Sequence, residues 1–348
     1  MTPPVPGPGP AGDRTTPRGL VGLVGLEAIR TAAAGLAGIV MRTPVVELGG
    51  SERSLWLKAE SLQSIGAFKI RGACNALASL SAEERARGAV TYSSGNHGRG
   101  VARAARLLGI PAIVVIPTDA PAVKVRAIAA DGAEIVAAGT SGDERRAVAE
   151  RIAAERGMAL VPPFDDDRII AGQGTIGLEL LDQLPDLSAV VIPIGGGGLA
   201  SGISAAIRAL RRNVRLIGVE PEFAADARDS LAAGRIVAWP ASATARTIAD
   251  GARTTALGRR TFAHLSALLD SIVTVSEPEI AAGIRLAAEQ ARLVVEPTGA
   301  LAVAALAFRA RELGIDGRTG PVVGIVSGGN VDPERYREWL AAPIPDWR

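Results

Sequence analysis

Short runs of apolar residues alternate with longer stretches rich in alanine and arginine along most of the chain. Continuous apolar runs, without interleaved polar positions, indicate strands that are buried on both faces, as in a parallel sheet. The expected strands span residues 55–57, 89–92, 112–116, 134–136, 189–194, 216–219, 272–275 and 322–326, and the clearest helical stretches span 101–108, 144–156, 199–211 and 297–312. This alternation predicts an α/β protein in which helices cover parallel sheets.

The order of these elements predicts two doubly wound parallel-sheet domains. Residues 88–165 have the pattern of a compact βαβαβ unit, and we expect this small domain to interrupt a large domain made of residues 27–87 and 166–348. Proline and glycine are frequent near the start of the chain, so residues 1–26 are expected to form a disordered tail. A ligand of two doubly wound units would bind beyond the carboxyl ends of their strands.

The composition excludes several classes of protein. An apolar content of 48% rules out a disordered chain, and a net charge of +2 gives no sign of binding to nucleic acid or to a membrane surface. The single cysteine, Cys74, excludes an internal disulfide framework and fits a reducing compartment, so we expect a cytoplasmic protein. Only Lys58, Lys69 and Lys124 are lysines among the 38 basic residues, which makes each a candidate for amine chemistry that arginine cannot perform.

Four consecutive glycines, Gly195–Gly198, follow the expected strand 189–194 and precede Leu199 in a helical stretch. Each glycine costs about 0.5–1 kcal/mol relative to alanine in ordered backbone, so four in a row indicate a need for bare backbone. Backbone N–H groups at a helix start bind phosphate. Together with Ala200, the same glycines satisfy a G-x-G-x-x-A pattern, and Glu220 stands where a ribose-binding acid would. A flexible turn and a nicotinamide-dependent dehydrogenase therefore remain alternatives at this point.

A lysine between apolar neighbours is the second signal. Lys69 lies between Phe68 and Ile70, in a chain that supplies its surface charge almost wholly with arginine. A solvated surface lysine is the ordinary interpretation, but burial here would lower the pKa of the amine toward that of a nucleophile. A nucleophilic lysine combined with a separate monophosphate site indicates pyridoxal phosphate.

Two further polar segments follow expected strands. Ser93-Ser94-Gly95-Asn96-His97-Gly98 joins the strand 89–92 to a helical stretch, where backbone N–H groups and hydroxyls suit a substrate carboxylate. A purely structural role for His97 remains open. Ser327 directly follows the strand 322–326, where its hydroxyl could meet an edge of a cofactor.

These segments together resemble the fold-type II pyridoxal-phosphate enzymes, which share the fold of the tryptophan synthase β-subunit, and within them the serine/threonine dehydratase and serine racemase branch. The resemblance extends over residues 27–335 and includes Thr43-Pro44-Val45, Ala171–Thr175, Thr247–Gly251 and Val295–Gly299. It implies Lys69 as the Schiff-base lysine beside Phe68, Asn96 at the phenolic oxygen, Ser327 at the pyridine nitrogen, and Gly195, Gly196, Gly197, Gly198 and Leu199 at the phosphate. It also implies that Ser93, Ser94, Gly95, Asn96 and His97 hold the substrate carboxylate and that Gly251 lines the substrate pocket.

The resemblance implies removal of water from a β-hydroxy amino acid such as serine or threonine, which yields a 2-keto acid and ammonia. The freed amine of Lys69 would take the α-proton. A racemase is the nearest alternative, because Ser94 stands where racemases of this branch carry a second catalytic acid/base. The nicotinamide-dependent dehydrogenase is more distant, since it gives Lys69 and Ser327 no role. Relatives are usually dimers, so a homodimer acting on a small amino acid is expected, without nucleic-acid or membrane partners.

The sequence also departs from the pattern of these relatives. Ile65-Gly66-Ala67 replaces the frequent Thr-Gly-Ser before the Phe-Lys pair, which favours a less polar substrate side chain. Arg99 stands where glutamine is usual, so nucleotide activation is not expected. The chain ends soon after Ser327, so we expect neither a C-terminal regulatory domain nor feedback control by isoleucine.

A divalent cation is the last expectation from the resemblance. Glu220, Ala224 and Asp226 have the spacing at which this branch binds a cation through two carboxylates and one backbone carbonyl. Oxygen ligands of this kind suit Mg²⁺ or Ca²⁺. A solvated acidic loop is the alternative.

Overall fold

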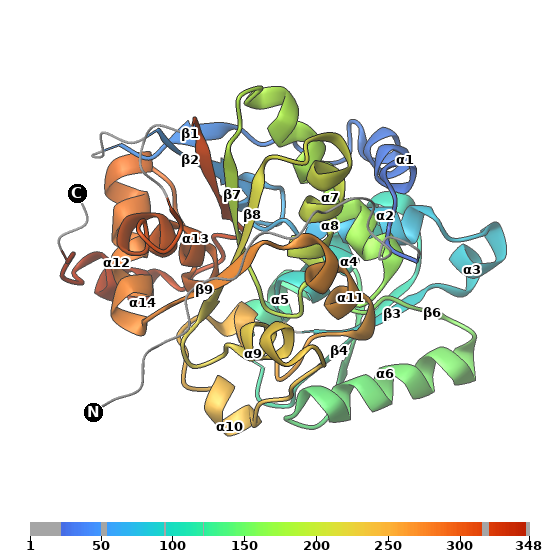
Figure 1. Cartoon of the computed structure of the whole chain (residues 1–348). Helices are drawn as coiled ribbons and strands as arrows, with labels where there is room; N and C mark the ends of the chain where they lie inside the picture. Colours follow the sequence, from blue (N-terminus) through green and yellow to red (C-terminus); the bar gives the residue numbers. More distant parts are fainter. Residues whose placement is uncertain (1–21, 50–53, 94, 121, 315–319, 346–348) are drawn as a thin grey trace.

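The computed structural model describes residues 22–49, 54–93, 95–120, 122–314 and 320–345, which form two sheets with surrounding helices (Figure 1). The larger sheet has the order β1-β2-β10-β7-β8-β9, and the smaller has the order β5-β4-β3-β6. The larger sheet contains β1 (Val45–Glu47), β2 (Leu55–Ala59), β7 (Ala189–Pro193), β8 (Arg215–Pro221), β9 (Ser271–Val275) and β10 (Val322–Val326). The smaller contains β3 (Ala89–Tyr92), β4 (Ala112–Ile116), β5 (Glu134–Ala137) and β6 (Ala159–Leu160).

Helices of very different exposure connect these strands. They are α1 (Leu26–Leu36), α2 (Lys69–Ala78), α3 (Ala82–Arg87), α4 (Asn96–Leu108), α5 (Ala122–Ala129), α6 (Gly142–Arg156), α7 (Asp167–Gln183), α8 (Gly198–Leu210), α9 (Asp226–Ala233), α10 (Ala241–Thr244), α11 (Arg259–Leu268), α12 (Glu277–Ala291), α13 (Pro297–Phe308) and α14 (Pro333–Leu340). Almost all of α13 is buried, whereas α6 buries only Ala149 and Ile152. An apolar helix such as α13 is stable only when it is enclosed by other elements.

The central strands are apolar throughout because both faces of the larger sheet are covered. In β7, Ala189 and Val191 pack into a core with residues of α12 and α13, whereas Val190 and Ile192 pack into a second core with residues of α7 and α8. Figure 1 shows these two pairs of helices on opposite sides of the sheet. The predicted fold class, α/β with doubly wound parallel sheets, is therefore confirmed.

The strand predictions hold with small shifts at the ends. All eight expected strands are present, and β3, β4 and β10 have the predicted bounds. Two strands were not expected: β6 has two residues, and β1 has three and pairs antiparallel with β2 at the edge of an otherwise parallel sheet. The predicted helix 297–312 ends at Phe308.

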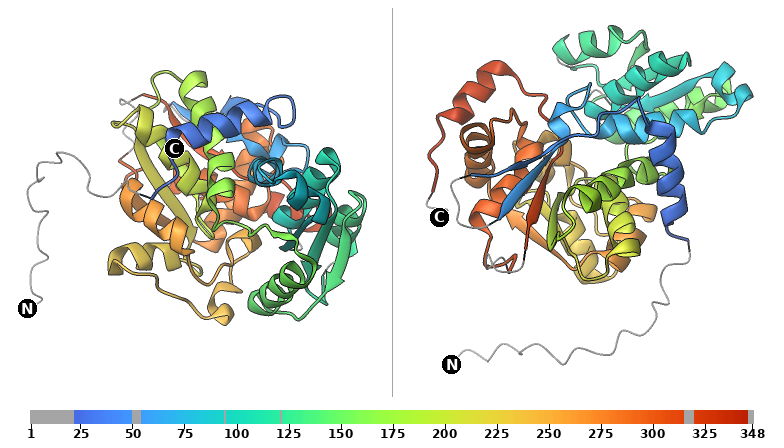
Figure 2. Two further views of the ribbon diagram at one scale, coloured as in Figure 1. Left: turned by 90° about the vertical axis from the view of Figure 1, so that its right-hand side faces the viewer. Right: turned by 90° about the horizontal axis from the view of Figure 1, so that it is seen from above.

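The smaller sheet is built entirely from residues within 88–165, and the larger one from residues on either side of that segment. Figure 2 shows the smaller unit packed against one side of the larger one. Of the predicted tail, residues 22–26 are described, and the prediction of disorder does not apply to them. Val24 is buried and donates its backbone N–H to Nε2 of His264 over 2.9 Å, and α1 begins at Leu26.

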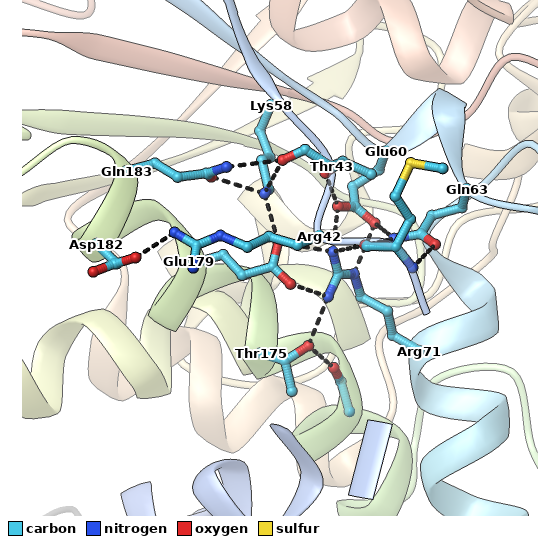
Figure 3. A network of polar contacts seen from close by, with 12 residues as sticks. Arg42, Thr43, Lys58, Glu60, Gln63, Arg71, Thr175, Glu179, Asp182 and Gln183 are labelled. Atoms are coloured by element: carbon cyan, nitrogen blue, oxygen red, sulfur yellow. Dashed lines mark hydrogen bonds and ion pairs between the residues drawn. The ribbon is translucent and has the colours of Figure 1, made fainter. Parts of the chain in front are cut away.

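A buried network of charges joins β2, α2 and α7 (Figure 3). The guanidinium of Arg71 forms a bidentate pair with Glu60, at 2.8 Å for both hydrogen bonds, and donates to Glu179 at 2.6 Å. Lys58 donates to the same Glu179 at 2.5 Å. Burial opposes the charge on Glu60, but the adjacent Arg71 prevails and lowers the pKa of this carboxyl. The network anchors the first turn of α2 to the larger sheet.

Three segments that the sequence singles out therefore follow the carboxyl ends of parallel strands. The glycine run follows β7, Ser327 follows β10, and Ser93 follows β3. This is the edge at which open α/β sheets bind ligands. Within the described ranges, no helix is both long and apolar enough to cross a membrane.

Candidate active site

Lys69 is the first residue of α2, and its side chain is partly buried. Nζ donates a hydrogen bond to the carbonyl oxygen of Pro163 over 2.7 Å and lies 5.1 Å from the ring centroid of Phe68. Burial lowers the pKa of the Lys69 amine to about 8. A substantial fraction of this amine is therefore neutral near physiological pH, which a nucleophilic lysine requires.

The segment after β10 lies directly beside Lys69. The N–H of Phe68 donates to the carbonyl oxygen of Ser327 over 3.0 Å, and the N–H of Gly329 donates to the carbonyl oxygen of Gly66 over 2.9 Å. Ala67 and Gly328 form an isolated antiparallel bridge between these two contacts. The structure thus brings the backbone of buried Ser327 next to that of Phe68, the neighbour of the lysine.

The glycine run connects β7 to α8 and bends sharply to do so. Gly197 has a φ of +88°, in the left-handed region, and α8 begins at Gly198. The first N–H groups of a helix have no partner within the helix, so they remain available to an anion. A Cβ at Gly196 would lie 2.1 Å from the ring of Phe164.

Pro163 and Phe164 link the lysine to the glycine run. The carbonyl of Pro163 accepts the hydrogen bond from Lys69, and the side chain of Phe164 packs on Gly196 and Gly198. The Lys69 amine and the glycine run therefore lie at the two ends of the short segment Pro163–Phe164. This arrangement fits a cofactor with an aldehyde at one end and a phosphate at the other, as the resemblance implies.

Replacing Gly196 with alanine is expected to weaken binding of pyridoxal phosphate by at least about tenfold. The added Cβ would displace Phe164, and with it the Pro163 carbonyl that holds Lys69. A titration that follows the absorption of the bound cofactor measures this effect. Gly142→Ala is the matched control, because nothing lies within 4 Å of a Cβ at Gly142. Equal affinities in the two variants would contradict the prediction.

Asn96 begins α4 and forms polar contacts with residues of the larger sheet unit. Its Nδ2 donates to Oε1 of Glu296 over 2.7 Å, and its Oδ1 accepts from Nδ2 of Asn330 over 2.8 Å. Burial raises the pKa of the Glu296 carboxyl to about 8, and the nearby charge of Asp250 adds to this effect. Glu296 therefore carries a proton over part of the neutral range.

The loop before α4 follows β3, as expected, but the structure does not show every side chain of this segment turned to a substrate carboxylate. A Cβ at Gly98 would lie 1.8 Å from the carbonyl oxygen of Ser93, so the loop requires glycine there. The Ser93 hydroxyl accepts from the N–H of Gly95 over 3.3 Å. Gly95 caps α4, so the N–H groups that follow it have no partner within the helix and can bind a carboxylate. Ser94 lies outside the described residues.

The His97 side chain makes its hydrogen bond inside the protein. It is buried, and its Nε2 lies 3.0 Å from the carbonyl oxygen of Val161. Burial, together with the charge of Lys69, lowers the pKa of His97 to about 3, so the ring stays neutral and its proton lies on Nε2. Any contact of His97 with a substrate carboxylate would therefore come from its backbone N–H.

Gly251 lies against the glycine run. Its carbonyl oxygen would be 2.9 Å from a Cβ on Gly195, and its N–H donates to the Thr298 hydroxyl over 2.9 Å. The position expected to line the substrate pocket is thus next to the expected phosphate site.

Glu220 and Asp226 lie together in a buried place at the end of β8. The oxygens of Glu220 accept from the N–H groups of Ala227 and Arg228, over 2.9 and 2.8 Å. Both carboxylate oxygens of Asp226 are buried and have no hydrogen-bond partner among the residues that the structure describes. Burial raises the pKa of Asp226 to about 7, and burial with the Asp226 charge raises that of Glu220. A solvated acidic loop is therefore wrong for these two residues.

Several residues at the site carried no assigned role in the sequence. They are Pro163, Phe164, Glu296, Thr298 and Asn330. The Glu-Pro pair at 296–297 was only a partial signal: proline favours the first turn of a helix, which places Glu296 at a helix start. The Glu296 side chain makes no cap hydrogen bond and turns to Asn96 instead.

Comparisons with known proteins agree with this geometry. Residues 36–328 match the family described as pyridoxal-phosphate dependent enzyme. The L-threo-3-hydroxyaspartate ammonia-lyase of Saccharomyces cerevisiae is 44% identical over 283 residues, which are 81% of this chain and 84% of the yeast protein. The L-threonine ammonia-lyase of Geobacter sulfurreducens is 46% identical over 278 residues, 80% of this chain and 67% of that protein. The structure of maize serine racemase is similar with a TM-score of 0.86 and 38% identity, covering 90% of this chain and 96% of the maize chain.

The family match includes every segment of the candidate site from Lys69 to Ser327. It leaves the nicotinamide-dependent alternative without support, because the family implies pyridoxal phosphate and Glu220 is already engaged by N–H groups of α9. The chain therefore belongs to the pyridoxal-phosphate dependent enzymes of fold type II, in the serine/threonine dehydratase and serine racemase branch.

Proposed function

We propose that this protein is an ammonia-lyase that removes water from a β-hydroxy amino acid and releases a 2-keto acid and ammonia. The placement of Lys69 carries the proposal: its amine has a pKa of about 8 and is linked through Pro163 and Phe164 to the glycine run. Similar proteins from yeast and Geobacter are named as ammonia-lyases for L-threo-3-hydroxyaspartate and L-threonine. Both of those substrates are β-hydroxy amino acids.

When bound, pyridoxal phosphate supplies an electron sink that stabilises negative charge at the α-carbon of the substrate. Lys69 would hold the aldehyde end of the cofactor, and its amine, once released, would take the α-proton. The N–H groups of Gly195–Gly198 and Leu199 would hold the phosphate, and Asn96 would donate to the phenolic oxygen. The backbone N–H groups of Asn96 and His97, which follow the cap residue Gly95, would orient the substrate carboxylate.

Ser327 favours elimination over transamination in this arrangement. A hydroxyl at the pyridine nitrogen does not enforce a protonated ring, unlike a carboxylate at the same place. Charge at the α-carbon is then stabilised only moderately, which suits a reaction that uses it promptly to expel the β-hydroxyl. The buried position of Ser327 beside the backbone of Phe68 supports this role.

Racemisation is a second candidate, because maize serine racemase is similar along 90% of this chain. It would require a second acid/base on the opposite face of the substrate, for which Ser94 is the candidate. Chiral analysis of the remaining L-serine distinguishes the two activities. D-serine formed as fast as pyruvate would favour the racemase, whereas pyruvate without D-serine supports the ammonia-lyase.

A panel of substrates tests the proposed function directly. Purified protein with pyridoxal phosphate is incubated with L-serine, L-threonine, 3-hydroxyaspartate and phenylserine, and keto acid and ammonia are both measured. We expect equal amounts of the two products from at least one of these amino acids. The apolar Ile65 and Ala67, both fully buried, favour the less polar substrates. No keto acid from any member of the panel would overturn the proposal.

We also propose that Glu220, Ala224 and Asp226 bind Mg²⁺ or Ca²⁺. The two unpaired, buried oxygens of Asp226 support this, since a buried carboxylate is stable only when it is neutralised, paired or bound to a cation. We expect millimolar Mg²⁺ or Ca²⁺ to raise the melting temperature by several degrees, and Asp226→Asn to abolish that rise. Asp182→Asn, which changes an exposed carboxylate, should retain it. Equal shifts in both variants would contradict the prediction.

We also propose that the protein is a cytoplasmic homodimer. The exposed side chains of Met41, Leu62 and Val294 provide apolar surface for a second copy, and Cys74 is a free, buried thiol of the kind that reducing compartments permit. Light scattering after size-exclusion chromatography is expected to give twice the chain mass of 35.6 kDa.

A further inference from the structure

Arg99 makes a contact that the proposed function does not use. It lies on α4, one turn after Asn96, and its Nη1 donates to Oδ1 of Asn330 over 2.9 Å. Its Nε is buried and has no hydrogen-bond partner among the residues that the structure describes. Arg99 therefore directs its hydrogen bonding at Asn330, which follows Ser327 beyond β10.

The chemistry of the guanidinium determines how the Asn330 side chain is oriented. Arginine only donates hydrogen bonds, so the side-chain atom of Asn330 that faces Arg99 must be the oxygen. The NH₂ group of Asn330 then faces the opposite way. Two acceptors lie there: the carbonyl oxygen of Ile65 at 2.7 Å and Oδ1 of Asn96 at 2.8 Å.

The same logic extends to the second amide. Because Asn330 donates to Asn96, the atom of Asn96 that receives this bond must be its oxygen. The NH₂ group of Asn96 is thereby turned toward the site, where it donates to Oε1 of Glu296 over 2.7 Å. Arg99 on one side of Asn330 and the Ile65 carbonyl on the other thus determine the donor and acceptor order of two consecutive amides.

We propose that Arg99 is a positioning residue, which together with the Ile65 carbonyl fixes both amides so that Asn96 presents a hydrogen-bond donor to the cofactor. This inference rests on the proposed function, in which Asn96 donates to the phenolic oxygen of pyridoxal phosphate. A glutamine at position 99 would not have this effect, because its amide offers either a donor or an acceptor. A lysine would retain it, because an ammonium also only donates.

The absorption spectrum of the bound cofactor reports this donor. A hydrogen bond to the phenolic oxygen stabilises its anionic form, and loss of the bond favours the neutral form, which absorbs at shorter wavelength. In Arg99→Met we expect the ratio of the short-wavelength band to the long-wavelength band to rise about fivefold, the change expected for one ordinary hydrogen bond. Arg99→Lys should retain the wild-type ratio.

Two further variants distinguish an effect of amide orientation from an effect of simply losing the Arg99 contact. Asn330→Asp keeps an acceptor for Arg99 but has no N–H group to donate to Asn96, so its spectrum should resemble that of Arg99→Met. Arg103→Met is the control on the same helix, because Arg103 bonds to Asp131 at 2.6 Å and has no contact with either amide. Its spectrum should equal that of the wild type.

The outcomes are distinguishable. A wild-type spectrum in Arg99→Met, or the same change in Arg103→Met, overturns the inference and leaves the proposed function intact. The absence of any cofactor band in the wild-type protein refutes the proposed function, and this inference with it. A shared change in Arg99→Met and Asn330→Asp, with Arg99→Lys unaffected, supports the inference.

Discussion

Replacing Lys69 with alanine is expected to lower turnover by at least about 10³-fold, because one amine both holds the cofactor and takes the α-proton. The methyl side chain supplies neither a nucleophile nor a base. The fold should be unchanged, since the Lys69 side chain makes one hydrogen bond, to the Pro163 carbonyl. Steady-state release of keto acid, measured beside circular dichroism of the same sample, checks both parts.

Lys124→Ala is the matched control for this loss. Lys124 is one of the three lysines, and it forms an ion pair with Asp250 at 3.0 Å in which both side chains are substantially exposed. We expect its replacement to leave turnover within about threefold, because such pairs contribute little. Borohydride reduction and peptide mass spectrometry should find the cofactor attached at Lys69 in the wild type. Full activity of Lys69→Ala would refute the assignment.

Replacing Arg71 with methionine is expected to lower the free energy of unfolding by about 3–5 kcal/mol. The guanidinium is fully buried and pairs with both Glu60 and Glu179, so its loss leaves two carboxylates without this partner, of which Glu60 is fully buried. Lys58 remains as a partner of Glu179, but it makes no hydrogen bond to Glu60 among the described contacts. Urea denaturation followed by tryptophan fluorescence measures the change.

An exposed pair provides the comparison for Arg71. Arg146 and Glu150 lie four residues apart on α6 at 2.7 Å, with both side chains largely in solvent. Arg146→Ala should cost no more than about 0.5 kcal/mol, because exposed helix pairs contribute little. A similar cost for the two arginine variants would show that the buried network does not anchor α2.

The network also predicts how stability depends on pH. Arg71 holds the pKa of Glu60 below its ordinary value of 4.5, so the folded state binds a proton less readily than the unfolded state. The stabilisation is therefore present above about pH 4.5 and is lost as the pH falls through the lower, folded-state value. Glu60→Gln should flatten this acid limb of the unfolding curve.

Local patterns were sufficient for the sheets and for the chemistry-bearing segments. β3, β4 and β10 have the predicted bounds because a strand buried on both faces requires an unbroken apolar run. The glycine run and the lysine between Phe68 and Ile70 were also recognisable from neighbouring residues, because each has an unusual local composition with a physical cost. Strands β6 and β1 were not predicted, because two or three residues are too few to show a pattern of apolar positions.

Contacts across the site join residues that are far apart in the sequence, so local patterns could not predict them. Lys69 and Pro163 are 94 positions apart, Asn96 and Glu296 are 200 apart, and Ile65 and Asn330 are 265 apart. His97 is the clearest example: its position after an expected strand suggested a substrate contact, whereas its buried ring bonds to the carbonyl oxygen of Val161, 64 positions away. Which distant segment covers a side chain depends on the order of strands and helices in space.

By itself, the sequence determined the alternation of strands and helices, the glycine run, the candidate lysine and the family resemblance, because each of these is encoded in neighbouring residues. Only the tertiary structure decided that Phe164 covers the glycine run, that Glu296 carries a raised pKa beside Asn96, and that Arg99 bonds to Asn330. These features arise from burial and from hydrogen-bond geometry between distant segments, and both exist only after the two sheets have packed together.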